Sequence, residues 1–219
     1  MVRTARFSED VFIDATMALI AEGGPAAATM QAIARRVGAP TGSIYHRFES
    51  RSTILGAAWN AAYASFVGAL APLLRAGHSR EAALAILPWS AEDERRARFL
   101  LLNDPVALFE DAPPPAALRE ELERLEDEFD NAFRTCVALH GSGAVREEEL
   151  ARAKFLIFDA PIAILRPHLL KRGPLPPFVA RMIDELHTGM PIADTRSGGM
   201  RPVPAACEGA APPFALDRP

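Results

Sequence analysis

The sequence predicts an all-α protein, and three observations support this fold class. Apolar residues recur at spacings of three and four over most of the chain, as they do on amphipathic helices. Strand-like alternation joined by Asn-Gly or Asp-Gly turns does not occur in it. Glycines and prolines divide the periodic stretches into segments of helical length. For 219 residues with 49% hydrophobic composition, we expect about nine helices in one large or two small domains.

The first 70 residues are expected to form four helices. Ser8, Thr29 and Ser50 each precede a periodic stretch, and hydroxyl side chains are favoured helix caps. Gly38 is expected to end the second helix, because the residue after a helix often needs a positive φ. The predicted helices run from Ser8 to the Gly23-Gly24-Pro25 break, over Met30–Val37, over Thr41–Arg47 with Pro40 at the first position, and from Ser50 to Pro72.

The following residues are predicted to form a second, larger set of helices. These run from Ser79 to Leu87, over Ala91–Leu102 behind a capping box of Ser90 and Asp93, over Pro105–Phe109, along a stripe from Leu118 to Cys136, over Val145–Leu170, and from 177 to 190. The stretch Phe155–Leu165 is apolar on all sides, so we expect it to be buried on every face. Residues 191–219 contain six prolines and three glycines, which predicts an extended or disordered tail.

Composition argues against several classes of protein. The 24 basic and 28 acidic residues give a net charge of −4, so the whole molecule has no excess positive charge for a polyanion. Cys136 and Cys207 lie in no CxxC or Cys/His cluster, so we expect neither a zinc site nor a secreted disulfide framework. The apolar run Phe155–Leu165 is shorter than the roughly 20 residues of a membrane span. We therefore expect no membrane segment and no export signal.

Catalytic patterns are also missing from the sequence. It has no Gly-rich phosphate loop, no nucleophile elbow and no metal-ligand spacing among its five histidines, so we expect no enzyme, no metal and no cofactor. Cys136 lies on an apolar stripe, where cysteine behaves as a small hydrophobic residue rather than as a redox sensor.

Two short helices separated by a tight turn at Gly38 have the spacing of a helix-turn-helix. In such a unit the second helix enters the major groove of DNA while the first crosses the backbone. The run from Thr29 to Leu55 resembles the DNA-binding signature of the tetracycline-repressor (TetR) family, and the resemblance extends back to Phe12. The positions that match the family pattern are Ile33-Ala34, Gly38, Gly42, Tyr45, Phe48 and Leu55.

The sequence departs from the family pattern at two positions. Pro40 replaces the usual Ser or Asp-like cap of the recognition helix, and Arg51 replaces the usual lysine at the start of the fourth helix. Arginine keeps the positive charge that binds phosphate, whereas Pro40 puts the capping of the recognition helix in question.

The residue types suggest roles at a DNA interface. Gly42 has no side chain, so its backbone can approach DNA closely. Thr41, Ser43 and His46 carry hydrogen-bonding groups that can reach base edges. The candidates for phosphate contacts are Tyr45, Arg47, Arg51 and Thr29, with Arg36 added. Two alternatives stay open: Tyr45 could belong partly to the core, and Arg35 and Arg36 could be plain surface charges.

The resemblance implies a domain for dimerisation and effector binding after the DNA-binding helices. We expect the DNA-binding domain at residues 1–52, a connecting helix at about 50–71, and the ligand-binding and dimerisation domain at 53–190. The helices at about 145–170 and 177–190 are the most apolar consecutive pair, so they are the candidates for a homodimer interface. A two-fold dimer places two recognition helices about 34 Å apart and favours a palindromic operator on double-stranded DNA.

Aromatic residues with a few polar neighbours are the candidate lining of an effector pocket. They are Trp59, Tyr63, Phe66, Trp89, Phe99, Asn103, Phe129, Phe133, Phe155 and Asp159, with Phe109, Phe158 and His168 as further candidates. Each apolar member fits a core position at least as well. Asp159 is the informative exception, because a carboxylate inside an apolar run must be paired, hydrogen-bonded or facing a polar cavity.

The sequence as a whole favours a cytoplasmic, ligand-responsive transcriptional regulator, released from its operator by a small molecule. The alternative is an all-helical ligand-binding protein or enzyme that keeps the N-terminal hairpin only as a structural element. The net charge of −4 conceals an asymmetry, because residues 29–51 carry four arginines against Glu49 alone. The local field decides DNA binding rather than the total.

Overall fold

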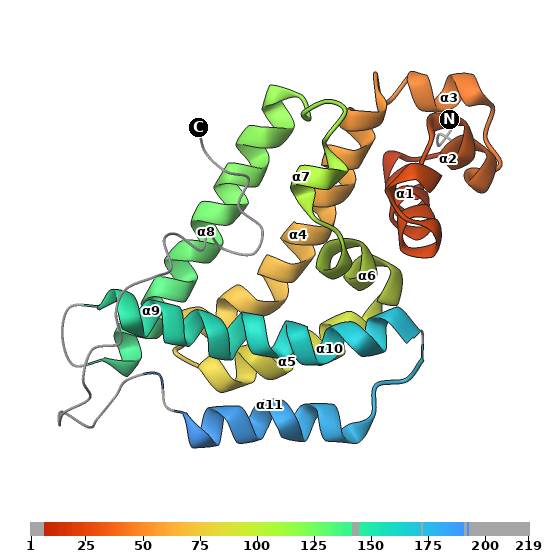
Figure 1. Cartoon of the computed structure of the whole chain (residues 1–219). Coiled ribbons are helices and arrows are strands. Elements are labelled where there is room, and N and C mark those ends of the chain that lie inside the picture. The colour runs from red at the N-terminus through yellow and green to blue at the C-terminus, as the bar shows by residue number, and fades with distance from the viewer. Residues whose placement is uncertain (1–6, 142–144, 172, 191, 193–219) are drawn as a thin grey trace, which may run out of the picture.

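The computed structural model describes residues 7–141, 145–171, 173–190 and 192. Within these residues the protein is all-α and contains no β-strand (Figure 1). The elements are α1 (Glu9–Gly23), a 3₁₀ turn η1 (Pro25–Ala27), α2 (Met30–Val37), α3 (Thr41–Tyr45), α4 (Arg51–Arg75), α5 (Ser79–Glu92), α6 (Glu94–Leu102), α7 (Pro105–Leu108), α8 (Ala116–His140), α9 (Glu147–Lys154), a π-helical turn η2 (Phe155–Asp159), α10 (Ala160–Lys171) and α11 (Pro177–Gly189). The predicted fold class is confirmed.

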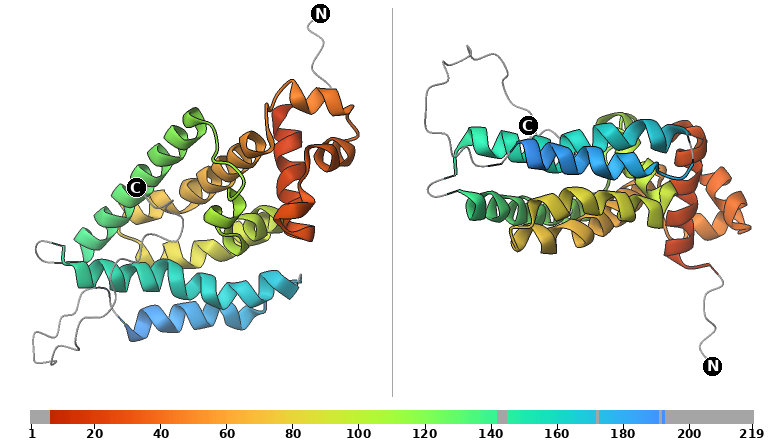
Figure 2. Two further views of the ribbon diagram at one scale, coloured as in Figure 1. Left: turned by 45° about the horizontal axis from the view of Figure 1, so that its top comes forward. Right: turned by 90° about the horizontal axis from the view of Figure 1, so that it is seen from below.

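Three short N-terminal helices, α1 to α3, form a head at one end of the molecule, and the long helix α4 leads from this head into the body (Figure 1). In the body α8 packs against α4. Figure 2 shows that the rod of α9 and α10 and its neighbour α11 form one layer, which lies over α4, α5 and α8. A continuous core links head and body, because Phe12, Ile33 and Ile44 belong to the same buried cluster as Trp59 and Phe99.

The fourth helix is longer than predicted, because it continues through Pro72 to Arg75. Proline removes one backbone hydrogen bond inside a helix, but the buried side chains of Leu70 and Leu74 on either side hold the extra turn in the core. Gly77, with φ 77°, then reverses the chain.

The predicted boundary between the fifth and sixth helices is wrong by several residues. Ser79 is the first residue of α5 rather than its cap, and α5 continues past Leu87 through Pro88 to Glu92. Burial of Trp89 and Ser90 stabilises this additional turn. Ser90 therefore opens no helix; Asp93 is the cap, accepting hydrogen bonds from the backbone N–H groups of Arg95 and Arg96 at 3.0 and 3.1 Å.

The helix predicted at Val145–Leu170 exists as a continuous rod, but it contains the π-helical turn η2. Lys154 donates hydrogen bonds to both carboxylate oxygens of Asp159 at 2.9 Å, across five residues of this wider turn. The expectation that the stretch is buried on every face is wrong, because Phe155 is 44% exposed and Ala163 is also exposed. Of the predicted tail, 191–219, all except Ile192 lies outside the described residues.

One helix of the described chain, α4, is long and apolar enough to cross a membrane, with a mean hydropathy of 1.4 over 18 residues. Buried residues make up 67% of that window, as expected for the core helix of a folded body. The apolar character of α4 is therefore explained by packing inside this protein.

Candidate nucleic-acid interface

The helix-turn-helix is closed by backbone hydrogen bonds at its turn. The Thr29 hydroxyl accepts a hydrogen bond from the Ala32 N–H at 3.1 Å and caps α2, as predicted. Gly38 takes the left-handed conformation, with φ 72°, which side chains with a Cβ rarely adopt. The Ala39 N–H then donates to the Ala34 carbonyl at 2.9 Å. Pro40 precedes α3 as its N-cap rather than as its first residue, so the chain turns into α3 without a side-chain cap.

Two apolar residues hold α3 against the rest of the head. Ile44 and Phe48 are buried, and the Phe48 ring meets the edge of Phe12 with centroids 6.4 Å apart. A helix of five residues has little stability of its own, so this packing fixes the orientation of α3. Its opposite face is open to solvent, as a surface that enters a DNA groove must be.

The predicted base-reading residues lie on or beside this open face. Thr41, Gly42 and His46 are exposed, and Ser43 is half-buried. Tyr45 is 53% exposed, so a large part of its side chain is accessible to a partner. A Cβ placed on Gly42 would meet no atom within 4 Å, and Gly42 is not among the glycines with positive φ. Neither packing nor backbone conformation within the described chain requires a glycine there.

The arginines of the head differ in their hydrogen-bond and ion-pair partners. Arg47 donates to the Ser43 carbonyl at 3.0 Å and its guanidinium stacks 5.8 Å from the centroid of the Phe12 ring, which leaves other N–H groups for a partner. Arg36 forms a bidentate pair with Glu22, at 2.7 and 2.5 Å. This pair raises the pKa of Arg36 and neutralises its charge beside α2.

Arg51 directs its guanidinium inward. Its Nη2 donates to the Pro25 carbonyl at 2.7 Å and its Nε to the Ala28 carbonyl at 3.0 Å. The remaining Nη1 lies 3.4 Å from the carboxylate of Asp111, which is itself 88% exposed. Arg51 therefore ties the start of α4 to the η1 turn, and only its outer edge faces solvent.

Comparison with known families agrees with this geometry. Residues 12–58 match the model described as bacterial regulatory proteins, tetR family, and this segment contains α2, the Gly38 turn and α3. Over these residues the chain matches the tetR family. The match supports DNA binding by the N-terminal domain, through its helix-turn-helix.

Solved structures of the same fold cover most of the chain. A tetR family transcription regulator from Shewanella sp. PV-4 is 15% identical, with a TM-score of 0.56, over 81% of this chain and 94% of that one. The fatty acid degradation regulator FadR from Bacillus halodurans is also 15% identical, with a TM-score of 0.59, over 86% of this chain and all of that one. At this identity the likeness concerns the fold. No curated protein matches the sequence.

The aromatic residues predicted to line an effector pocket lie together in the body of the protein. The Phe66 ring contacts Trp89 and Phe129 with centroids 5.0 and 5.7 Å apart, and Phe129 contacts Phe158 at 5.2 Å. Tyr63 meets Phe129 at 6.1 Å. Phe133 contacts Phe158, and Trp59 contacts Phe99. These rings pack on one another, and we call them the aromatic cluster.

The other predicted effector residues lie outside the aromatic cluster. Asn103, the residue after α6, donates to the Phe99 carbonyl at 2.9 Å. Asp159 is paired with Lys154, and Phe155 is 44% exposed. Tyr63 is buried in the cluster, and this burial raises its pKa above the usual range.

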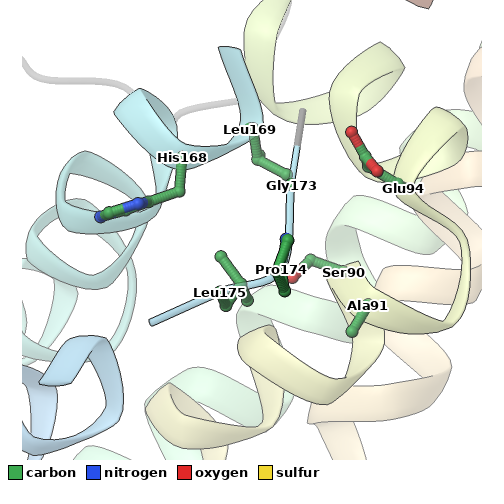
Figure 3. Close-up of a pocket in the computed structure, with 8 residues that line it drawn as sticks. All are labelled: Ser90, Ala91, Glu94, His168, Leu169, Gly173, Pro174 and Leu175. Atoms are coloured by element: carbon green, nitrogen blue, oxygen red, sulfur yellow. The ribbon is translucent and has the colours of Figure 1, made fainter. Parts of the chain in front are cut away.

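A cavity among the described residues lies away from the aromatic cluster, between the α5–α6 junction and the end of α10 (Figure 3). Its volume is about 170 Å³, below the roughly 300 Å³ at which ligand pockets begin. It is lined by Ser90, Ala91, Glu94, His168, Leu169, Gly173, Pro174 and Leu175. Of the residues singled out from the sequence, His168 is here, but Figure 3 shows its ring turned away from Glu94.

Sequence reasoning missed the acidic partners of two arginines in the head. Glu22 pairs with Arg36 and Asp111 with Arg51, and neither acidic residue stands near its partner in the sequence. No local pattern could have identified these pairs.

Proposed function

We propose that this chain is a ligand-responsive repressor that binds a palindromic operator as a homodimer and leaves it when a small molecule binds the body. The observation that carries the proposal is the open N-terminal end of α3, with Thr41 and Gly42 exposed on a hairpin fixed by buried Ile44 and Phe48. The head comprises residues 1–52 and the ligand-binding and dimerisation body residues 53–190. A transcriptional regulator of this kind works in the cytoplasm.

In this proposal Thr41, Ser43 and His46 contact base edges, and Gly42 allows the backbone to approach the DNA. Thr29, Tyr45, Arg47 and Arg51 contact phosphates. For Arg51, a phosphate takes the place of the Asp111 carboxylate beside Nη1. The Nη2 and Nε groups keep their hydrogen bonds to the Pro25 and Ala28 carbonyls. Arg36 contributes only after it separates from Glu22.

Selection of random DNA duplexes on the purified protein tests the function. Enrichment of two half-sites in inverted repeat supports the regulator. If no sequence is enriched even at low salt, the alternative remains, which is an all-helical ligand-binding protein or enzyme with a structural hairpin.

The phosphate assignment has its own measurement. Replacing Arg47 or Arg51 by Ala should weaken binding to all sequences and lower the salt slope, that is, the dependence of log K on log salt, by about 1 for each phosphate that the variant no longer binds. Substitutions of Thr41 or Ser43 should instead change the sequence preference. Unchanged salt slopes in both arginine variants would contradict the assignment.

The homodimer interface is proposed on the outer faces of α10 and α11. Leu170 is 59% exposed, and Phe178 and Met182, one helical turn apart on α11, are each 43% exposed. The opposite face of α11 is already occupied, because Val179 and Ile183 pack on Ala83 of α5. Light scattering should give twice the chain mass for the wild type, and Met182→Glu should yield the monomer while α11 stays folded by circular dichroism.

The aromatic cluster is the proposed effector site. Because its rings fill the space between them, a ligand must open the cluster, and the energy of opening couples ligand binding to the shape of the body. A thermal-shift screen with apolar and aromatic metabolites tests this, since a ligand that binds only the folded state raises the unfolding temperature. A hit should also release the selected operator.

A further inference from the structure

One arginine joins the DNA-binding head to the helix proposed for dimerisation. Arg98 lies on α6, which packs against both α1 and α10, and these three helices meet in Figures 1 and 2. Its Nη2 and Nε donate to the Ala21 carbonyl of α1 at 2.9 and 3.2 Å. Its Nη1 donates to the Leu169 carbonyl of α10.

Both acceptors lie in the last turn of their helices, where the backbone carbonyl groups carry partial negative charge. A half-buried guanidinium placed between two such helix ends forms charge-assisted hydrogen bonds with both. A lysine ammonium is a single point and lacks the planar fork that reaches in two directions.

Other contacts attach the head to the body without Arg98. The head also packs on α4 through α1, with Phe12 in the common core. Next to Arg98, by contrast, the end of α10 borders the cavity of Figure 3, and Leu169 lines it. The Arg98 hydrogen bonds therefore fix the position of α1 relative to α10 at a place where packing is incomplete.

We propose that Arg98 is a positioning residue that sets the distance between the two DNA-binding heads, and so determines which spacing of operator half-sites is bound. The inference rests on the proposed function, since it requires a dimer joined through α10 and α11. Adding one base pair between half-sites moves them apart by about 3.4 Å and rotates one by about 35°. A head that is held at one position relative to α10 fits one spacing, and a loosened head tolerates several.

The test compares operators in which the selected half-sites are moved by one and two base pairs in each direction. The wild type should bind one spacing best. In Arg98→Met the ratio of affinities between the best spacing and its neighbours should fall at least about fivefold, which lies within the usual range of coupling between sites. Binding to a single half-site and the salt slope should stay unchanged, because Arg98 contacts no DNA. Arg98→Lys should give an intermediate ratio.

Arg134→Met is the matched control. Within the described residues Arg134 pairs with Asp130 of the same helix, α8. This variant therefore removes the same charge without changing a contact to a second helix, and its spacing profile should match the wild type. If Arg98→Met is unfolded at the assay temperature, Arg98→Lys decides the question by the same ratio.

The outcomes separate the two proposals. A wild-type protein that selects no paired half-sites would refute the proposed function, and this inference with it. The wild type and the folded Arg98 variants could share the same sharp preference for one half-site spacing. That result would overturn this inference and leave the proposed function standing. Equal losses on single and paired half-sites would also overturn it, since Arg98 would then only maintain the fold of the head.

Discussion

Gly42 offers a substitution whose effects on stability and on DNA binding have opposite signs. It is the second residue of α3 and is exposed. Since a Cβ at this position meets nothing within 4 Å and φ is not positive, alanine fits the free protein without strain. In the complex the same methyl group would stand between the helix backbone and the DNA.

The magnitudes follow from these two environments. Alanine is better than glycine in a helix by about 0.5–1 kcal/mol, so Gly42→Ala should raise the free energy of unfolding by up to that amount and the unfolding temperature by about 1–4 °C. An added methyl in a closely packed contact costs about 1–3 kcal/mol. With one contact in each head of the dimer, operator affinity should fall at least about tenfold, since 1.4 kcal/mol corresponds to a factor of ten.

Gly68 of α4 supplies the matched control. It is also exposed, and a Cβ there also meets nothing within 4 Å. Gly68→Ala should therefore stabilise the protein by a similar amount and leave operator affinity unchanged. The measurements are thermal unfolding by circular dichroism and fluorescence anisotropy on the selected operator at fixed salt. A stabilised Gly42→Ala variant that binds as tightly as the wild type would refute close approach of α3 to DNA; a destabilised variant would refute the claim that the free chain needs no glycine there.

Three further predictions address charge and burial. Glu22→Gln removes the ion pair of Arg36 and should steepen the salt slope by about 0.9 for each additional phosphate bound. Stability should change little, because exposed ion pairs contribute little to it; an unchanged slope would mean that Arg36 reaches no phosphate. Burial raises the pKa of the Cys136 thiol to about 11, so in a Cys207→Ser background Ellman's reagent should react only with unfolded protein, and fast reaction of the native protein would contradict this burial. Burial also lowers the pKa of His187, so the folded state prefers the neutral ring; stability should decline as pH falls below about 6.5, and this decline should be smaller in His187→Gln by thermal unfolding at pH 5 and 7.5.

The head could be predicted from the sequence because its signals are local. The cap at Thr29, the left-handed turn at Gly38 and the buried pair Ile44 and Phe48 all act within about 20 residues of one another, so each local preference agrees with the final structure. Spacing alone is a weak signal, since helical hairpins with a glycine turn are common; the residues that match the family signature identify the helix-turn-helix.

Boundaries in the body could not be predicted in the same way, because tertiary packing overrides local signals there. Pro72 and Pro88 both suggest helix ends, yet burial of Leu74 and Trp89 carries α4 and α5 past them. A hydrophobic run likewise cannot reveal a π-helical turn. The apolar neighbours of Asp159 suggest a ligand contact, whereas in the structure this carboxylate pairs with Lys154 across that turn.

The charge of the DNA-binding face shows most clearly what only three-dimensional structure adds. Counting residues 29–51 gives four arginines against one glutamate, but Glu22 pairs with Arg36 and Asp111 with Arg51. Long-range attraction to DNA is therefore weaker than the count suggests, since each paired arginine presents little net charge. Specific binding must then depend on correctly placed base contacts in two heads at once. A residue that fixes the separation of the heads therefore has a large effect on operator binding. Arg98 is the proposed residue, because it donates hydrogen bonds to both α1 and α10.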